Sequence, residues 1–528
     1  MTEEVDQATE RRVIEPDKPD ESLGSTRLLY ALVASFAGRT ASPLVSILLM
    51  PFFLSLLGAE SIGLIGLYTT VMSLLVIVDH VLGLFVTRET ARRSHCRHHP
   101  EIGDILLTAQ TAYLVTGVAI AMAITSAAPF IAHSWISSTN LEAPTVITCV
   151  VLAGWTMPPQ LLFNLNVSFL LGLERQFEAN ALLAGLGIGR GVLGALAIVY
   201  MGPTPEIYFG SQLAVIAVCL VGALAIAWRR IPAGGKRPTL RFHLLTDSWR
   251  FSSLLIANAL VFVIVSQADK VIVSGLLPLH TFGHYVLAGS IASLPALVVS
   301  PFMTVLLPRF ARLVEARADG QISDVYHACS QFVSIAVLPA WAIVILFSDA
   351  LVLLWTGNSE TAAELRVVLP LLFSGATLLA LNCAPNSLAL AAGWSKYPWY
   401  ANMVAVLGIP LALLLTPVFG AAGATAVWIG LGLANIIVTP TMLHRHLLIG
   451  EQMRWYLNDI IIPFVAGTAS ALVARLSLPL ATTRMSQLLE FAAIGSIVLL
   501  ATATATPLVR AQALNIVARL LTPKQPSM

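Results

Sequence analysis

A succession of long apolar runs constrains this chain more than any motif does. A helix that spans a bilayer needs about 20 mostly apolar residues. Fourteen runs meet this requirement: 28–56, 62–87, 105–131, 144–171, 180–200, 207–228, 251–277, 283–307, 325–348, 365–391, 398–416, 421–442, 457–475 and 485–507. Strands of a membrane barrel would be shorter and would alternate apolar with polar side chains. The runs therefore predict an all-α polytopic membrane protein with about fourteen transmembrane helices.

The composition agrees with a membrane location. Of the 528 residues, 57% are hydrophobic and 11% are charged, and the mean hydropathy is +0.82. A soluble protein carries roughly a quarter charged residues. The net charge of +2 gives no reason to expect a nucleic-acid partner. The five cysteines form no framework, so disulfides are not expected.

The distribution of basic residues predicts the orientation of the spans. Loops on the cytoplasmic side of a membrane carry an excess of Lys and Arg. With fourteen spans and the N-terminus inside, the cytoplasmic segments collect Arg88, Arg92, Arg93, Arg97, Arg229, Arg230, Lys236, Arg237, Arg241, Arg250, Arg309, Arg312, Arg317, Lys396, Arg445, Arg454, Arg510, Arg519 and Lys524. The outside loops hold only Arg366, Arg475 and Arg484. Both termini are therefore expected in the cytoplasm.

The expected organisation has two lobes and an additional helix pair. The predicted parts are a disordered cytoplasmic tail (1–27), an N-terminal six-helix lobe (28–228), a basic cytoplasmic linker (229–250), a C-terminal six-helix lobe (251–442), an extra transmembrane helix pair (457–507) and a cytoplasmic tail (508–528). The first residues do not match a secretory signal peptide, so the first span is expected to act as an uncleaved insertion signal.

An internal repeat supports the two lobes. When the chain is aligned with itself at an offset of 220 residues, PLHTFG falls on GAESIG and Gly283 falls on Gly63. A cluster of basic residues follows the span in both halves. Gly172 matches Gly393 at a nearly equal offset. Two six-helix repeats that begin on the same side of the membrane would be parallel repeats. A chance match between apolar sequences is the alternative. The charges are not repeated, since Asp79 aligns with Val299.

Charged and polar side chains within the spans are the candidates for a functional site, because a charge in the bilayer centre usually faces water or a partner. The candidate substrate-binding residues of a polar cavity between the lobes are Arg39, Ser42, Ser46, Gln160, Asn164, Arg190, Gln267 and Lys270. The candidate ion-coupling residues are Asp79 and Asp269. Arg39 ranks first, because it shares one helical face with Ser35, Ser42 and Ser46.

Each candidate has a structural alternative. Serine and asparagine stripes in membrane bundles often only join helices. Arg39 and Asp79 would also fit an ion pair between neighbouring spans, and the glycines beside Arg190 would fit close packing. Asp269 and Lys270 are adjacent, so on a helix they point about 100° apart and cannot both face one cavity. The HCRHH cluster (95–99) lies in a basic loop without organised carboxylates, which indicates a solvated loop and no metal site.

Several segments resemble one transporter superfamily. LLGAESIGLIGLY followed by an acid and RETARR resembles the first hairpin of the polysaccharide-type (Wzx-like, O-antigen or exopolysaccharide) flippases, which belong to the multidrug/oligosaccharidyl-lipid/polysaccharide exporter superfamily. SQADKVIVSGLLPLHTFGHYVLA, DALVLLWTG and TPVFGAAGATAVW are similar to the same family. The resemblance covers roughly residues 28–445.

The resemblance implies a flippase that moves a polyprenyl-pyrophosphate-linked oligosaccharide across the inner membrane by alternating access, for the biosynthesis of a surface polysaccharide. The substrate would be lipid-linked, and a polysaccharide polymerase and glycosyltransferases of the same pathway would be partners. Arg39, with Arg190 and Lys270, would offset the pyrophosphate charge. No cofactor is expected apart from a coupling H⁺ or Na⁺ ion.

Three other functions stay open. A multidrug antiporter of the same superfamily would need an acidic cavity, whereas three buried bases here outnumber two buried acids. A peptidoglycan-precursor flippase would need a more cationic cavity. A membrane glycosyl polymerase or ligase would need a long outside loop with clustered acids, Arg or His, and none is visible. A Walker motif is also absent, so the chain is expected to be a transporter that does not itself hydrolyse ATP.

Overall fold

The structure is a computed structural model of the chain. The structure describes residues 21–78, 82–94, 101–231, 238–241, 253–394, 396–477, 483–507 and 509–510, and within them it describes the side chains of all residues except 21–42, 76–78, 94, 101, 253–257, 259, 304, 397 and 398. These residues form helices joined by short turns, and the described part of the chain contains no strand. The prediction of an all-helical polytopic membrane protein is therefore confirmed.

The N-terminal part of the fold contains α1 (Glu21–Val78), α2 (Leu84–Ser94), α3 (Glu101–Phe130), the π-helical turn η2 (Ile131–Trp135), α4 (Ala143–Trp155), α5 (Met157–Gly172), α6 (Gln176–Met201) and α7 (Pro205–Arg229). We refer to these helices as the N-lobe, following the predicted boundary.

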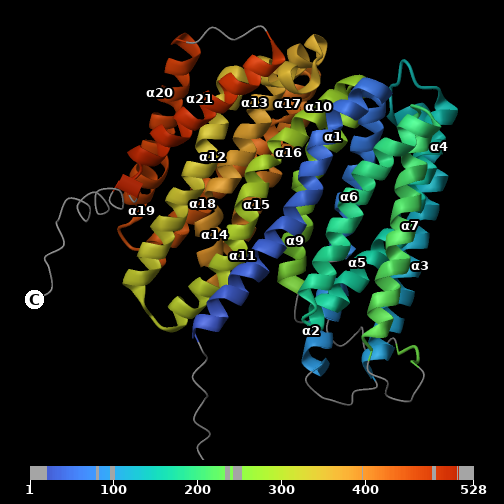
Figure 1. The fold of residues 1–528 in the computed structure, drawn as a ribbon, viewed down its shortest axis with the longest axis horizontal. Helices are drawn as coiled ribbons and strands as arrows, with labels where there is room; N and C mark the ends of the chain where they lie inside the picture. The colour runs from blue at the N-terminus through green and yellow to red at the C-terminus, as the bar shows by residue number, and fades with distance from the viewer. Residues whose placement is uncertain are drawn as a thin grey trace, which may run out of the picture.

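The C-lobe contains α9 (Ser253–Leu276), α10 (Leu279–Ala292), α11 (Leu294–Glu315), α12 (Asp319–Thr356), α13 (Ser359–Leu381), α14 (Cys383–Ala391), α15 (Lys396–Val406), α16 (Gly408–Phe419), α17 (Ala421–Ala424) and α18 (Ala426–His446). The C-terminal pair contains α19 (Gln452–Arg454), the π-helical turn η3 (Trp455–Ile461), α20 (Ile462–Ser477) and α21 (Arg484–Ala505). Figure 1 shows this pair (red) at one edge of the molecule and α3, α4 and α7 at the opposite edge.

Twelve helices in the described residues are long and apolar enough to cross a membrane, judged by length and composition. One of them, Pro43–Leu75, includes described residues of both the first and the second predicted span. The seventh predicted span corresponds to α9, which is not among the twelve. The chain is a multi-pass membrane protein, and the count of fourteen spans stays a prediction.

Prolines divide three of the predicted spans. New helices begin at Leu294, Cys383 and Gly408, so that Pro295, Pro385 and Pro410 each lie in a first helical turn. A first turn tolerates proline, because its N–H would have no partner in the helix anyway. Pro43 and Pro51 instead lie inside α1.

The fold turns sharply at Gly58. The φ angle of this residue is 77°, in the left-handed region that suits glycine, and the helix breaks there. Residues 21–57 form the first half of α1 and residues 59–78 the second half. In Figure 1, the first half (blue) crosses the bundle diagonally and reaches this break at the upper end. We call this end the kink end, and the opposite end, where α2, α7, α11 and α18 finish with Arg92, Arg229, Arg312 and Arg445 in their last turns, the basic end.

Large apolar side chains are exposed along the outer helices, as expected for a surface that faces lipid. Examples are Leu48, Val199, Leu414 and Leu476, of which Leu476 is 79% exposed. Inside, one apolar cluster runs from the N-lobe into α10, α12 and α13 of the C-lobe. A separate cluster in the C-lobe includes Trp455 of η3, so the C-terminal pair is packed into that lobe.

Candidate functional site

The lobes approach most closely at the kink end, where the second half of α1 crosses α10. A Cβ atom added to Gly283 of α10 would overlap the carbonyl oxygen of Ala59 and would lie 3.1 Å from the backbone nitrogen of Gly63. A Cβ atom added to Gly63 would lie 2.7 Å from the carbonyl oxygen of Leu279. Glycine at both positions therefore allows the two backbones to touch, as small residues do at close helix crossings in membranes.

The two glycines are the pair that the repeat aligned. The sequence predicted that they hold equivalent positions in the two halves, and the structure brings them into one contact between the lobes. We call the contact of Ala59, Gly63, Leu279 and Gly283 the glycine crossing.

The turn between η2 and α4 adds polar contacts to the same seam. The backbone N–H of Leu279 donates to the carbonyl oxygen of Ser137 at 2.9 Å. Trp135 donates from Nε1 to Oγ of Ser274 at 3.2 Å, and its ring covers Gly275. Both bonds join the N-lobe to the C-lobe, so they close the same end as the glycine crossing.

Glu60 fixes this turn to the kink. Its side chain is buried, and its carboxylate accepts hydrogen bonds from the backbone N–H groups of Thr139, Asn140 and Leu141. The Thr139 hydroxyl donates a further bond at 2.6 Å. One carboxylate thus collects the donors of a whole turn, which positions Ser137 beside Leu279.

A polar pocket lies at the kink end over this seam. It has a volume of about 670 Å³. Its lining includes Glu60, Asn140, His280, His284, Asn358 and Thr361. Both lobes contribute to it, so motion at the seam would change its shape.

Three predicted substrate-binding residues are joined in the N-lobe. Arg190 of α6 donates from Nη2 to Oε1 of Gln160 at 2.7 Å, and Gln160 donates from Nε2 to Oδ1 of Asn164 at 2.7 Å. The Arg190 side chain is half-buried, and its Nε atom has no partner among the described residues. Among the described residues, no carboxylate forms an ion pair with Arg190.

Arg190 lies beside the helix that crosses between the lobes. The next residue, Gly191, packs against Val45 and Leu49 in the first half of α1. Gln212 of α7 donates to the backbone oxygen of Arg190 at 3.2 Å and so holds α6 in place. The guanidinium is therefore a positioned, partly dehydrated cation whose hydrogen-bond capacity is not filled by acids of the described residues.

The predicted candidates on α9 separate as the helical geometry required. Asp269 is 1% exposed, and its Oδ2 accepts bonds from the Tyr285 hydroxyl at 2.6 Å and from Trp428 Nε1 at 2.7 Å. Lys270 is half-buried and donates to Gln267 Oε1 at 2.8 Å. Asp269 thus joins α9 to α10 and α18, while Lys270 and Gln267 lie on another face.

The remaining candidates lie partly outside the described residues. Asp79 and the HCRHH loop fall outside them, as do the side chains of Arg39 and Ser42, although the backbone of both belongs to α1. The Ser46 side chain is exposed. The described residues hold no cluster of His, Cys, Asp and Glu that would bind a metal ion.

Sequence comparison identifies the family. The model of a family described as "Polysaccharide biosynthesis protein" matches residues 55–362, which is more than half of the chain. The chain belongs to this family. The match begins just before the Gly58 kink and ends at the start of α13, so it includes the glycine crossing, Arg190 and Asp269. No curated protein sequence matches this chain significantly.

Solved structures with the same fold are transporters. A structure titled "Lipid II flippase MurJ, inward closed conformation" matches 92% of this chain and 100% of its own, with a TM-score of 0.66 and 14% identity. An inward-facing multidrug resistance MATE transporter of the MOP superfamily matches 80% of this chain and 95% of its own, with a TM-score of 0.62 and 15% identity.

A third similar structure is a MOP superfamily transporter from Pyrococcus furiosus. It matches 80% of this chain and 96% of its own, with a TM-score of 0.55 and 15% identity. This member of the polysaccharide biosynthesis family therefore has the fold of the MOP superfamily, and the predicted resemblance is confirmed.

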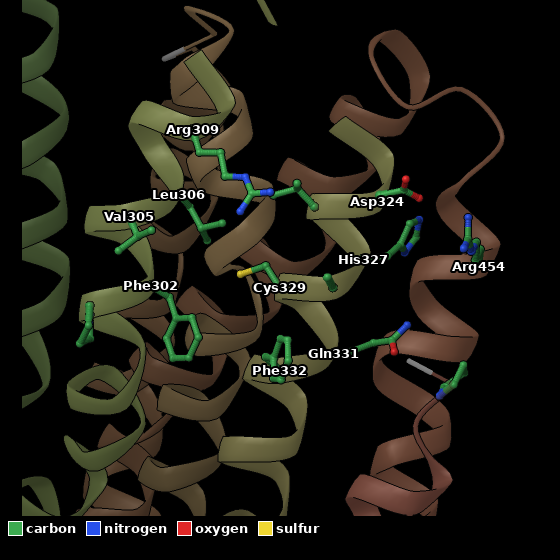
Figure 2. Close-up of a pocket in the computed structure, with 14 residues that line it drawn as sticks. Phe302, Val305, Leu306, Arg309, Asp324, His327, Cys329, Gln331, Phe332 and Arg454 are labelled. Atoms are coloured by element: carbon green, nitrogen blue, oxygen red, sulfur yellow. The ribbon is translucent and has the colours of Figure 1, made fainter. Parts of the chain in front are cut away.

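An apolar groove lies at the basic end of this family member, between α11, α12 and the C-terminal pair. Its volume is about 980 Å³. Figure 2 shows Phe302, Val305 and Leu306 on one side of it and His327 and Arg454 on the other. Apolar walls with basic groups near one end suit an amphipathic, anionic molecule such as a lipid phosphate.

Sequence reasoning missed two features of the site. Glu60 stands in the GAESIG motif, but its role as the acceptor for residues 139–141 depends on a turn about 80 residues away. Trp135 contacts α9, which lies in the other lobe. The position of Glu60 within the glycine-rich GAESIG turn could have marked it as a structural acid. Nothing in the sequence around Trp135 indicated its contact with α9.

Proposed function

We propose that this protein is a flippase that moves a polyprenyl-pyrophosphate-linked oligosaccharide from the cytoplasmic to the outer leaflet of the inner membrane. The observation that carries this proposal is Arg190, a positioned cation beside α1 whose Nε atom has no partner in the described residues. A pyrophosphate supplies the acceptor oxygens that such a guanidinium lacks, in charge-assisted hydrogen bonds. Family membership supports the link to polysaccharide biosynthesis.

The arrangement of the lobes supports alternating access. The glycine crossing and the Ser137–Leu279 bond close the kink end, which the distribution of basic residues predicts to face outside. The head group would bind from the basic end, with the lipid tail in the membrane or in the apolar groove. Rocking of one lobe against the other would then open the kink end.

Other polar residues would complete the head-group site. Gln160 and Asn164 continue the chain from Arg190, and Lys270 with Gln267 would contribute from the C-lobe. Arg39 and Ser42 of α1 stay proposed members. A coupling ion would bind at Asp79 or at Asp269, and at Asp269 it would compete with the bonds that this carboxylate accepts from Tyr285 and Trp428.

Replacement of Arg190 tests the proposal in cells. We expect Arg190→Ala to reduce surface polysaccharide about 10- to 100-fold, since a hydrogen bond to a charged group is worth about 1.5–3 kcal/mol. Lipid-linked oligosaccharide should accumulate in the membrane. Arg190→Lys keeps the charge and should retain part of the activity.

A matched control is Arg230→Ala, which removes an arginine that pairs with Glu178 near the surface. It should leave the polysaccharide unchanged. Normal polysaccharide in Arg190→Ala at a normal protein level would refute the role of Arg190. Sensitivity to cationic drugs after loss of the whole protein, with normal polysaccharide, would instead favour the multidrug antiporter.

A further inference from the structure

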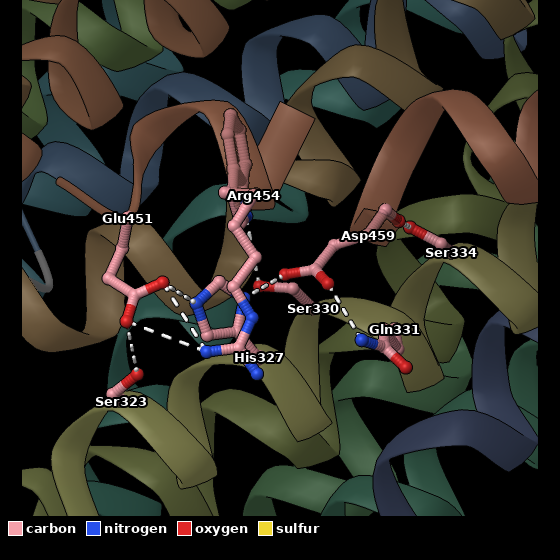
Figure 3. Close-up of polar contacts among 9 residues, drawn as sticks. Ser323, His327, Ser330, Gln331, Ser334, Glu451, Arg454 and Asp459 are labelled. Carbon is pink, nitrogen blue, oxygen red and sulfur yellow. Dashed lines mark hydrogen bonds and ion pairs between the residues drawn. The ribbon is translucent and has the colours of Figure 1, made fainter. Parts of the chain in front are cut away.

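A buried polar cluster joins the C-terminal pair to α12 at the basic end (Figure 3). Asp459 lies on η3 and is fully buried. Its Oδ2 is hydrogen-bonded to Nδ1 of His327 at 2.5 Å, and its Oδ1 accepts a bond from Nε2 of Gln331 at 2.8 Å. Both partners belong to α12, so the carboxylate is a tie between two parts of the fold that are distant in sequence.

The imidazole of His327 lies between two carboxylates. Its Nε2 is 3.3 Å from Oε2 of Glu451, on the side opposite Asp459. The Glu451 side chain is 27% exposed, whereas Asp459 is completely enclosed. Three proton-carrying groups therefore lie in a row, from Glu451 near the surface, through His327, to the buried Asp459. The hydrogen bond is on the Nδ1 side, and Nε2 lies at an ion-pair distance from Glu451.

The backbone around Asp459 is also unusual. η3 is a π-helical turn, a rare geometry that occurs frequently at functional sites. Ser334 donates to the backbone oxygen of Asp459, and fully buried Trp455 donates from Nε1 to Ser330 Oγ at 3.0 Å. A contact that only packed η3 against α12 would not need a carboxylate at position 459, because burial of a charge is costly.

Other titratable and charged groups face this cluster from each element packed against it. They are Asp324 and Tyr326 of α12, His444 of α18, Arg454 of α19, Tyr456 of η3 and, across the groove, Arg309 of α11. The ring of Tyr326 packs edge-on against both His327 and His444. His444 uses Nδ1 to donate to the carbonyl of Pro440, so of these two histidines it is His327 that lies between two carboxylates.

Glu451 is suited to the accessible end of the path. Burial raises the pKa of its carboxyl group, but Arg454, His327 and Ser323 together outweigh that effect and hold the pKa below its usual value. Glu451 therefore stays charged near neutral pH and attracts a proton toward His327.

We propose that His327, Asp459 and Glu451 form a proton-binding site that exchanges with water at the basic end and controls how tightly the C-terminal pair docks on the C-lobe. A proton on His327 gives an imidazolium attracted to both carboxylates, which holds η3 against α12. When that proton leaves to water, the buried carboxylate keeps only neutral donors, and the docking weakens. Docking is therefore tighter while His327 carries the proton between two charged carboxylates than after the proton has left.

The site connects to the apolar groove. His327, Gln331 and Arg454 all line that groove, so a weaker tie between η3 and α12 would widen it. Through the groove, the proton would affect movement of the lipid-linked substrate. This coupling rests on the proposed function, whereas proton binding and docking do not.

Hydrogen exchange of the purified full-length protein tests the site without any substrate. Peptides covering residues 451–461 are followed at about pH 6 and about pH 8, on either side of the usual titration range of histidine. After correction for the intrinsic pH dependence of amide exchange, we expect η3 to exchange several-fold faster at the higher pH. His327→Gln and Asp459→Asn should abolish this difference.

Two further variants keep the test decisive. His446→Gln removes an exposed histidine at the C-terminal end of α18, near the cluster but outside it, and should leave the pH difference intact. Glu451→Gln changes a partly exposed residue and should reduce the difference without loss of the fold. Exchange independent of pH in the wild-type protein, or an unchanged difference in His327→Gln, would overturn the proposal. If the export experiments contradict the flippase function while the pH difference is present, the proton-binding site is still supported and only the flippase function is refuted.

Discussion

Gly283 has no side chain because the backbone of Ala59 occupies the space where one would lie. Gly63 has the same relation to Leu279 from the other side of the crossing. The offset of 220 residues between the two glycines was visible in the sequence, but their mutual contact was not, because a repeat gives equivalent positions and no relative placement of the lobes.

Substitution of Gly283 by alanine should disturb the closed kink end selectively. The added methyl group has no space, and overpacking of this kind costs about 1–3 kcal/mol. We expect Gly283→Ala to export surface polysaccharide poorly while it still inserts into the membrane. Gly289→Ala is the control, because Gly289 lies on the same helix with open space around its Cβ position. Equal export by the two variants would contradict the importance of the crossing.

Among the elements, α1 and the turn after η2 are joined by a single side chain, Glu60. Its carboxylate serves three consecutive backbone N–H groups, and without a charge it would lose part of each bond. The turn after η2 then places Ser137 against Leu279. A change at Glu60 therefore acts on the seam between the lobes through an element that the carboxylate positions.

Glu60→Gln should lower the thermal stability of the purified protein. A buried hydrogen-bond acceptor of this kind contributes about 2 kcal/mol, and the amide cannot replace the charge. Glu142→Gln, at an exposed glutamate just after the same turn, should leave the unfolding temperature unchanged. Equal unfolding temperatures for both variants and the wild type would show that the carboxylate is not needed.

The helices were predictable from the sequence, and the polar contacts between distant elements were not. Apolar runs located the helices, and the 100° step between Asp269 and Lys270 predicted their separation onto different faces. Pro295, Pro385 and Pro410 each lie in the first turn of a helix, where the continuous apolar runs predicted the interior of a span. His327 and Asp459 escaped detection because 132 residues separate them and neither lies in a recognisable motif.

At the scale of the whole molecule, the seam between the lobes is closed at one end by backbone contact and two polar bonds. Ala59 to Gly63, Ser137 and Trp135 belong to the N-lobe, and their partners belong to α9 and α10. The proposed flippase mechanism requires this seam to open during each cycle. A covalent bond across it should therefore stop transport without unfolding the protein.

Cysteines at Ser137 and Leu279, whose backbones are joined by a 2.9 Å hydrogen bond, supply that bond. Export of the lipid-linked oligosaccharide is measured in cells that carry the double variant, before and after oxidation and again after reduction, beside both single variants. We predict that oxidation abolishes export in the double variant alone and that reduction restores it. Undiminished export by the fully cross-linked protein would contradict alternating access through the kink end.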